Sequence, residues 1–386
     1  MLKGLFKHEE KKVEYIELIY DLIFVYIIGR NNSLLHNIED GFIPPMTYLT
    51  YFLTTLIVLQ VWYFTTLFIN RYGTNGVAEH ICLFINMYLL YYMADGTNAA
   101  WQDQYAQYNI AWALILVNLS VQYFLKLRQC PGKEPLLRRH ILFNIGLLLG
   151  EAAIVLASIP VFYRTGLALS PVAMGAGIVA VLTFGGRINR SVPVDFGHLS
   201  ERVMLYVVFT FGEMIIGIAG YFGGGVNFRN IYFSLMGFLI VAGLFLIYGY
   251  YYDHIIDRER STHGTAYMMI HILLIAMLNN ITAALEFMRE PEVDEVKKNA
   301  FLVVSFVLYF AFLFMTLSYA KPYHKPSPLF LGVAGGLTAA FAILMAAFYR
   351  DSIVSIAVTV VYIYSMFVSN VIFARREHRL NCAPSE

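Results

Sequence analysis

Residues 229–252 read RNIYFSLMGFLIVAGLFLIYGYYY, and Arg229 is the one charged residue in this run. An α-helix needs about 20 residues to cross the hydrocarbon core of a bilayer, so this stretch is long and apolar enough to span a membrane. Eleven other stretches have a similar length and character. The twelve predicted spans cover residues 14–30, 46–69, 80–100, 107–127, 138–160, 170–187, 201–222, 229–252, 264–286, 299–320, 327–349 and 353–374. We therefore predict an all-α integral membrane protein with no separate soluble domain.

The composition agrees with a membrane protein. Of the 386 residues, 59% are hydrophobic and 14% are charged, whereas a soluble domain carries about 25% charged residues. The 27 basic and 26 acidic residues nearly balance, so the chain has no bulk attraction to nucleic acid. The three cysteines are scattered and show no CxxC spacing, which argues against a disulfide framework or a zinc site. We predict no cofactor and no bound metal.

The distribution of basic residues predicts the orientation of the spans. With the N-terminus inside, 20 of the 27 Lys and Arg residues fall in inner segments and 7 in outer ones. Cytoplasmic loops of membrane proteins carry such an excess of positive charge. The four lysines before the first span precede no small-residue cleavage site, so this span is predicted to be retained. Both termini are expected in the cytoplasm.

The chain also predicts two six-helix halves, residues 1–190 and 191–386. A shift of 184 residues places the first span on the seventh and the sixth on the twelfth, and it places Glu17 on Glu201. An even number of spans gives both halves the same orientation, as in transporters built from parallel repeats. The alternative is that any twelve evenly spaced helices align with themselves.

Several ionisable residues lie inside the predicted spans, and most are on odd-numbered ones. A charged side chain in hydrocarbon costs from about 2.5 to more than 10 kcal/mol, depending on the method, and usually marks a functional path. Carboxylates and imidazoles at successive depths are suited to a proton relay. The alternative is that they join neighbouring helices as structural hydrogen bonds.

Glu17 and Asp21 are four residues apart, so they share one face of the first span. Two carboxylates on one face need a cation between them, and Arg202 or His198 at the start of the seventh span is the expected partner. Together with Glu201, these residues are predicted to form an inner gate or an ion-pair network; the alternative is an ion pair that only fixes helix packing. Ser200 is the expected N-cap of the seventh span.

Glu151 and Glu213 are the strongest candidates for proton carriers. Each follows a glycine, Gly150 or Gly212, near the middle of its span, and a small residue lets a helix or a ligand approach closely. Burial favours the neutral form of a carboxyl group, so each could take up and release a proton. The alternative is a protonated carboxyl that donates one hydrogen bond to a neighbouring helix.

His271 and Asp95 complete the set of candidates. His271 lies in the ninth span at a depth similar to that of Asp21, and it is either a relay group or a core histidine with satisfied hydrogen bonds. Asp95 lies toward the outer end of the third span.

The segment from Glu17 to Val25, ELIYDLIFV, resembles the opening motif of the bacterial low-temperature-requirement protein A family, Glu-Leu-Phe-Phe-Asp-Leu-Val-Phe-Val. The stretch from His198 to Arg202, followed by Gly212 and Glu213, resembles the second hallmark of that family, His-Leu-x-Glu-Arg leading to Leu-Gly-Glu. Residues 62–70 and 250–271 are similar to its weaker conserved stretches. The resemblance implies a bacterial polytopic membrane protein named for a cold-growth phenotype, and it implies no substrate.

We predict a multi-pass protein of the bacterial cytoplasmic membrane that transports protons, or a small solute coupled to protons. In this hypothesis Glu213 and Glu151 carry protons near the midplane, and Asp21 and His271 relay them. One rival is a membrane protein that supports cold adaptation through lipids or partners. Another is an intramembrane enzyme, for which we find no catalytic motif. The sequence leaves open the substrate, the choice between channel and carrier, and the oligomeric state.

Overall fold

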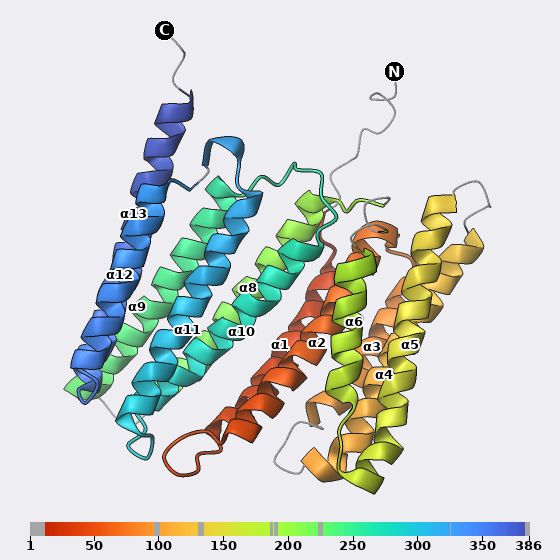
Figure 1. Ribbon diagram of the computed structural model, residues 1–386, viewed down its shortest axis with the longest axis horizontal. Coiled ribbons are helices and arrows are strands. Elements are labelled where there is room, and N and C mark those ends of the chain that lie inside the picture. The colour runs from red at the N-terminus through yellow and green to blue at the C-terminus, as the bar shows by residue number, and fades with distance from the viewer. Residues whose placement is uncertain are drawn as a thin grey trace. The chain divides into compact units, whose positions relative to one another are not determined.

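The computed structural model describes most of the chain and is almost entirely helical over that part (Figure 1). The described residues are 12–95, 101–129, 135–185, 188, 192–222, 227–324 and 326–382, with the backbone alone at 101, 102 and 377–382. The predicted cytoplasmic placement of the chain ends concerns residues 1–11 and 383–386, which lie outside these ranges. The chain divides into two compact units.

Unit 1 comprises residues 1–34, 46–206 and 258–268. Its helices are α1 (Tyr15–Asn32), α2 (Pro45–Tyr72), α3 (Val77–Asp95), α4 (Trp101–Gln129), α5 (Pro135–Thr165), α6 (Ser170–Ala180, continued by a π-helical turn, Val181–Gly185) and the first half of α8 (Phe196–Gly217). α3 packs on α1 and α4, and α5 packs on α4 and α6. α2 is the most enclosed of these helices, since every residue from Ile57 to Asn70 is buried. A helix that is apolar all round belongs in the interior of a bundle.

Unit 2 comprises residues 35–45, 207–257 and 269–386. It holds the rest of α8 with the turn Ile218–Phe222, α9 (Phe228–Tyr250, continued by the π-helical turn Tyr251–Ile255), most of α10 (Thr265–Phe287), α11 (Glu295–Met315), α12 (Pro328–Ala347) and α13 (Ser352–Cys382). α13 packs on both α9 and α12, and α11 packs on α12. Side-chain caps begin three of these helices: Asn227, Asp294 and Ser327 each accept a hydrogen bond from the backbone N–H three residues on.

Each of the twelve predicted apolar stretches contains one of these helices. Within the described residues, ten helices are long and apolar enough to cross a membrane. The two others differ for clear reasons. α1 carries Glu17, Asp21 and Arg30 within 18 residues, and the apolar helix Ser170–Gly185 is shorter than a full span. A polytopic helical membrane protein is therefore shown, whereas twelve spans and the internal repeat stay predictions.

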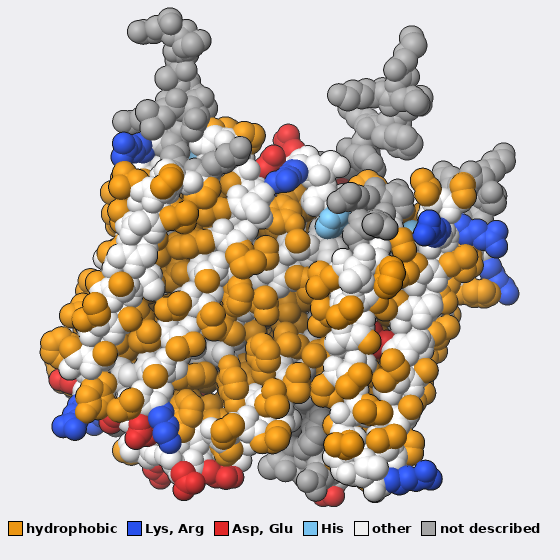
Figure 2. Space-filling view, viewed as in Figure 1, with side chains coloured by type: hydrophobic (Ala, Val, Ile, Leu, Met, Phe, Trp, Pro, Cys, Tyr) orange, Lys and Arg blue, Asp and Glu red, His pale blue; other side chains and the backbone are white. Residues whose placement is uncertain are grey.

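The surface of each unit agrees with this interpretation. Hydrophobic side chains cover the visible face along the length of the helices, and the charged side chains collect near the helix ends (Figure 2). Less than a third of the apolar span of α12 and of α5 is buried inside the protein. Exposed apolar side chains over the whole length of a helix are expected where lipid tails are the solvent.

Candidate functional site

An ion-pair cluster lies in the interior of unit 1, where α1, α2 and the start of α8 meet. Glu17 and Asp21 point from one face of α1, as their spacing predicts, and Arg202 reaches them from α8. The side chains of Asp21 and Arg202 have no exposed surface, and Glu17 is 2% exposed. The cluster is therefore closed off from the surroundings of the protein.

Arg202 binds the two acids at once. Its Nε and Nη2 atoms donate to the two oxygens of Asp21 at 3.0 and 2.8 Å, a fork of two parallel hydrogen bonds. Its Nη1 atom donates to Glu17 Oε2 at 3.0 Å. The planar guanidinium supplies these three donors in a fixed geometry, which a lysine could not reproduce.

Trp62 of α2 gives Asp21 a further hydrogen bond, from indole Nε1 to Oδ1 at 2.9 Å. Its ring packs against Tyr206 of α8, with ring centroids 4.5 Å apart. Asp21 thus accepts three hydrogen bonds, from two other helices. This carboxylate is held in one position and fixes α1, α2 and α8 relative to one another.

His198 lies one helical turn before Arg202 and completes the cluster. Its Nε2 atom lies 3.3 Å from Glu17 Oε2, and its Nδ1 atom lies 3.0 Å from Asn70 Nδ2. The side-chain oxygen of Asn70 accepts from the backbone N–H of Asp195, and its Nδ2 also donates to the Asp195 carbonyl. These two bonds fix the orientation of the amide, so Nδ1 of His198 is the acceptor. The ring proton is then on Nε2, facing Glu17.

The start of α8 differs from the prediction. Ser200 is not the N-cap, because its hydroxyl donates to the Gly197 carbonyl inside the helix. Asp195 takes the capping role, since its Oδ1 accepts from the backbone N–H of His198 at 3.1 Å. The helix begins four residues earlier than Ser200, and this places His198 inside its first turn.

Glu201 lies outside the cluster that was predicted to include it. Neighbouring residues on a helix point about 100° apart, so Glu201 and Arg202 face different directions. Glu201 is half-buried, and no ion pair of Glu201 is found in the part of the chain that the structure describes.

A second group in unit 1 surrounds Glu151, at the middle of α5. Glu151 is 3% exposed, and neither carboxyl oxygen has a hydrogen-bond partner among the described residues. The Gln60 amide of α2 is its polar neighbour, close enough to act on the carboxyl although no hydrogen bond of ordinary geometry joins them. Gly177 of α6 lies against both: a Cβ atom there would be 2.6 Å from Glu151 Oε2 and 2.5 Å from Gln60 Nε2. The approach of α6 to this carboxyl therefore needs a glycine.

Unit 2 holds the second predicted proton carrier. Glu213 of α8 is half-buried, and the charged group that acts on it is Glu286 at the end of α10. Glu286 in turn pairs with His36, whose Nε2 lies 3.0 Å from Glu286 Oε2. At Gly217 a Cβ atom would lie 2.6 Å from Glu286 Oε1. Two acids and one imidazole thus lie close together in this unit.

The two remaining candidates have contrasting surroundings. His271 of α10 is 1% exposed, and its ring packs edge-on against Tyr248 with centroids 6.0 Å apart. Asp95 is the last residue of α3 and is exposed. Asp95 is therefore not part of either buried group in unit 1.

Comparison with known proteins gives one match. The family model described as bacterial low temperature requirement A protein (LtrA) matches residues 12–364. The chain belongs to this family. No match was found among curated proteins or among solved structures. The LtrA match includes every candidate residue discussed above.

Sequence reasoning missed several residues of these groups. Trp62 and Asn70 bound one of the weaker LtrA-like stretches, but nothing in the sequence gave them a partner. Glu286, His36 and Gln60 lie at span ends or among apolar residues, where a single polar side chain carries little signal. Among the described residues no cluster of three or more His, Cys, Asp or Glu is arranged to hold a metal ion.

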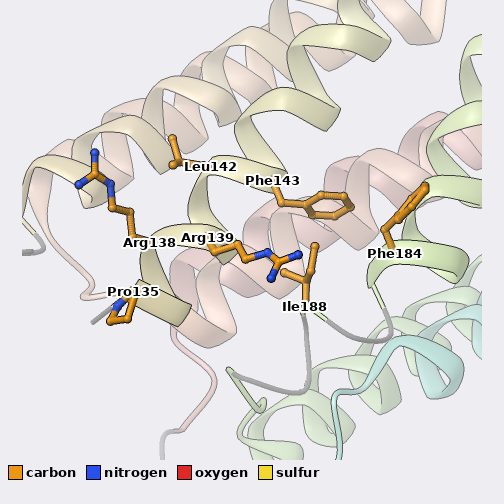
Figure 3. A pocket seen from close by; sticks show the side chains of 7 residues that line it. All are labelled: Pro135, Arg138, Arg139, Leu142, Phe143, Phe184 and Ile188. Atoms are coloured by element: carbon orange, nitrogen blue, oxygen red, sulfur yellow. The ribbon is translucent and has the colours of Figure 1, made fainter. Parts of the chain in front are cut away.

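A groove of about 590 Å³ lies at the start of α5 in unit 1 (Figure 3). Arg138 and Arg139 edge it, and Phe143 and Phe184 form apolar parts of its lining. None of the candidate residues lines this groove.

The pair of His36 and Glu286 predicts a pH dependence of stability. The hydrogen bond to Glu286 raises the pKa of His36 above its ordinary value. A raised pKa in the folded state stabilises the protein below the ordinary pKa, and that stabilisation is lost as the pH rises through the folded pKa. Because the His36 side chain is 52% exposed, we expect a loss below about 1 kcal/mol.

Thermal unfolding of purified protein at pH 5.5 and pH 8.5 would measure this effect. The native chain should lose more stability across this interval than His36→Gln does. An equal change in the two proteins would show that the pair contributes nothing.

Proposed function

We propose that this LtrA-family membrane protein moves protons across the bilayer, alone or coupled to a small solute. The observation that carries the proposal is the Glu151 carboxyl, which lies at the middle of a candidate span with neither oxygen hydrogen-bonded within the described residues. A charge left unpaired there would be very costly. Glu151 therefore rests in its neutral form and is charged only when a proton leaves it.

Glu213 is the corresponding group of unit 2 in this proposal. It lies near a second acid, Glu286, which acts on it electrostatically. His271 and Asp95 stay candidate relay groups. The Arg202 cluster has a different role: Asp21 is held by three hydrogen bonds, so we assign Glu17, Asp21, His198 and Arg202 to positioning the helices around the path.

A second function is favoured by the closed Arg202 cluster itself. A protein that supports growth in the cold through lipids or partners needs tightly paired polar groups and no path for ions. Every carboxylate of the cluster has a partner, as this function requires. Glu151 separates the two proposals, because a purely structural acid at that position would be expected to hold a hydrogen bond.

A proteoliposome assay tests proton movement. Vesicles with a trapped pH-sensitive dye receive a proton gradient, and the rate of its decay is measured for the native chain, Glu151→Gln and empty vesicles. Glutamine keeps the size and the neutrality of the resting carboxyl but carries no exchangeable acid proton. We expect the flux of Glu151→Gln to fall to that of empty vesicles while its thermal stability stays close to native.

Asp103→Asn is the matched control, since it makes the same acid-to-amide change at an exposed position of α4 in the same unit. It should keep the native flux, and Glu213→Gln reports separately on unit 2. A native flux equal to that of empty vesicles would remove the proposal, as would full flux through Glu151→Gln.

A further inference from the structure

A cavity of about 390 Å³ lies at one end of unit 2. Neither Glu213 nor Glu286 lines it. Three separate segments form it: the end of α9 with its π-helical turn, the short 3₁₀-helical turn Pro322–His324, and the end of α13. The lining side chains that can form hydrogen bonds are Tyr250, His254, Lys321, Tyr323, His324 and Arg375.

Among the described residues, the lining is basic and contains no carboxylate. Lys321 and Arg375 are permanent cations, and within the described residues neither forms an ion pair with an acid. His254 and His324 add two imidazoles that can donate through a ring N–H. Cationic donors that converge without a counter-charge from the protein favour an anionic ligand.

The backbone holds these side chains in place. The Lys321 backbone N–H donates to the Ile255 carbonyl at 2.9 Å, and its carbonyl accepts from the His324 N–H at 2.9 Å. Rings support the walls: Tyr250 packs on His254 with centroids 4.9 Å apart, and Tyr323 packs on His324 with centroids 4.7 Å apart. The site is thus built by packed elements, and the ends of the Lys321 and Arg375 side chains are left to bind a ligand.

The donors match a phosphate group. A guanidinium, an ammonium and tyrosine hydroxyls are the groups that bind phosphate oxygens in proteins. The volume falls within the roughly 300–1,000 Å³ range of small-ligand pockets. α9 and α13 are candidate membrane spans, so the cavity lies at a membrane end of unit 2, where tyrosines are enriched and lipid headgroups lie.

We propose that this cavity binds the phosphate group of an anionic ligand at the membrane surface. The ligand is either the headgroup of an anionic phospholipid or a soluble phosphate compound, and both present the same oxygens. Basic pockets between membrane helices bind acidic headgroups in other proteins. This site does not depend on proton movement through Glu151, since the two groups share no residue.

The test measures thermal unfolding of the full-length protein in neutral detergent while a ligand is titrated. The probes are phosphatidylglycerol, phosphatidylcholine as the neutral lipid, and inorganic phosphate. A ligand that binds only the folded state raises the melting temperature in a saturable way. Native protein is compared with Arg375→Gln and with Lys321→Gln/Arg375→Gln.

Arg376→Gln is the matched control. Arg376 is the next residue of α13, it is also exposed, and it does not line the cavity. We expect phosphatidylglycerol to stabilise the native protein and Arg376→Gln equally. Its apparent affinity for the double variant should be at least about tenfold weaker, since each charged hydrogen bond contributes severalfold or more to binding. Arg375→Gln gives the same comparison if the double variant does not fold.

Each outcome decides the question. Saturable stabilisation by phosphatidylglycerol and not by phosphatidylcholine or inorganic phosphate identifies a phospholipid site. Saturation by inorganic phosphate, with the same loss in the variants, identifies a soluble phosphate ligand. No saturable effect in the native protein would overturn the proposal, and so would equal affinities in the native protein and in Arg375→Gln. These results are independent of proton flux, so either proposal can fail alone.

Discussion

Replacement of Arg202 by methionine is expected to lower the free energy of unfolding by about 3 to 5 kcal/mol, the usual cost of leaving a buried charge without its partner. The reason is the geometry of the cluster: among the described residues Arg202 is the cation that binds both Glu17 and Asp21, and all three side chains are almost completely buried. Without it, two carboxylates four residues apart face each other in a dry interior.

Thermal or denaturant unfolding in detergent measures this loss. Arg138→Met is the control, because Arg138 is exposed and forms no ion pair among the described residues; it should change stability by less than about 0.5 kcal/mol. The neutral triple variant Glu17→Gln/Asp21→Asn/Arg202→Met should recover most of the loss, because no charge is left buried. An Arg202→Met protein as stable as Arg138→Met would show that the ion pairs do not hold α8 to α1.

Replacement of Gly264 by alanine is expected to lower the free energy of unfolding by about 2 to 5 kcal/mol. The left-handed backbone accounts for roughly 1–2 kcal/mol of this loss and overpacking for roughly 1–3 kcal/mol. Gly264 precedes α10 with φ at +73°, a conformation that residues with a Cβ atom rarely adopt. An added Cβ would also lie 2.4 Å from Leu199 Cδ2 and 3.1 Å from Val194 Cγ2. Leu199 is completely buried, so its methyl group has no free space to enter.

Gly166 provides a control that separates the two contributions. It follows α5 with φ at +74°, but a Cβ atom there would meet nothing within 4 Å. Gly166→Ala should therefore cost only the roughly 1–2 kcal/mol of backbone strain. If unfolding measurements give equal losses for Gly264→Ala and Gly166→Ala, the packing of Leu199 against Gly264 contributes nothing.

Hydrophobic length was enough to predict the helices. Each predicted apolar stretch overlaps a helix because a long and mostly uncharged run has no stable alternative in a membrane. Helix ends were less predictable. α8 begins at Phe196, five residues before the predicted start, because Asp195 caps it and its backbone pairs with the Asn70 side chain. A contact between residues 125 positions apart leaves no local signal in the sequence.

Helical periodicity made the ion-pair partners predictable. Residues four apart lie on one helix face, so the face of Glu17 and Asp21 could be matched with the face that His198 shares with the cation Arg202. Glu201 was wrongly placed in the cluster because the prediction considered its charge and not the direction in which its side chain points from α8. Trp62 was missed because an indole among apolar neighbours looks the same whether or not its N–H has a partner.

Glu151 and Glu213 show that the position of a residue along a span does not predict how its side chain is buried. Both follow a glycine near the middle of a span, yet Glu151 is enclosed and Glu213 is half-buried near Glu286. Helical periodicity gives the relative directions of side chains on one helix but not which neighbour each one meets. The Gly177 approach to Glu151 and the Gly217 approach to Glu286 come from other segments, and only the structure places them.

The Arg202 cluster also has a consequence for biosynthesis. Asp21 emerges from the ribosome 181 residues before Arg202, which at bacterial and eukaryotic elongation rates amounts to roughly 10 to 35 s. During that interval α1 has two acidic side chains and no guanidinium from Arg202 to neutralise them, so we expect its stable packing to wait for a helix made in the second half of translation. Nascent chains that stop before α8 should leave α1 accessible to water, and chains that include α8 should not.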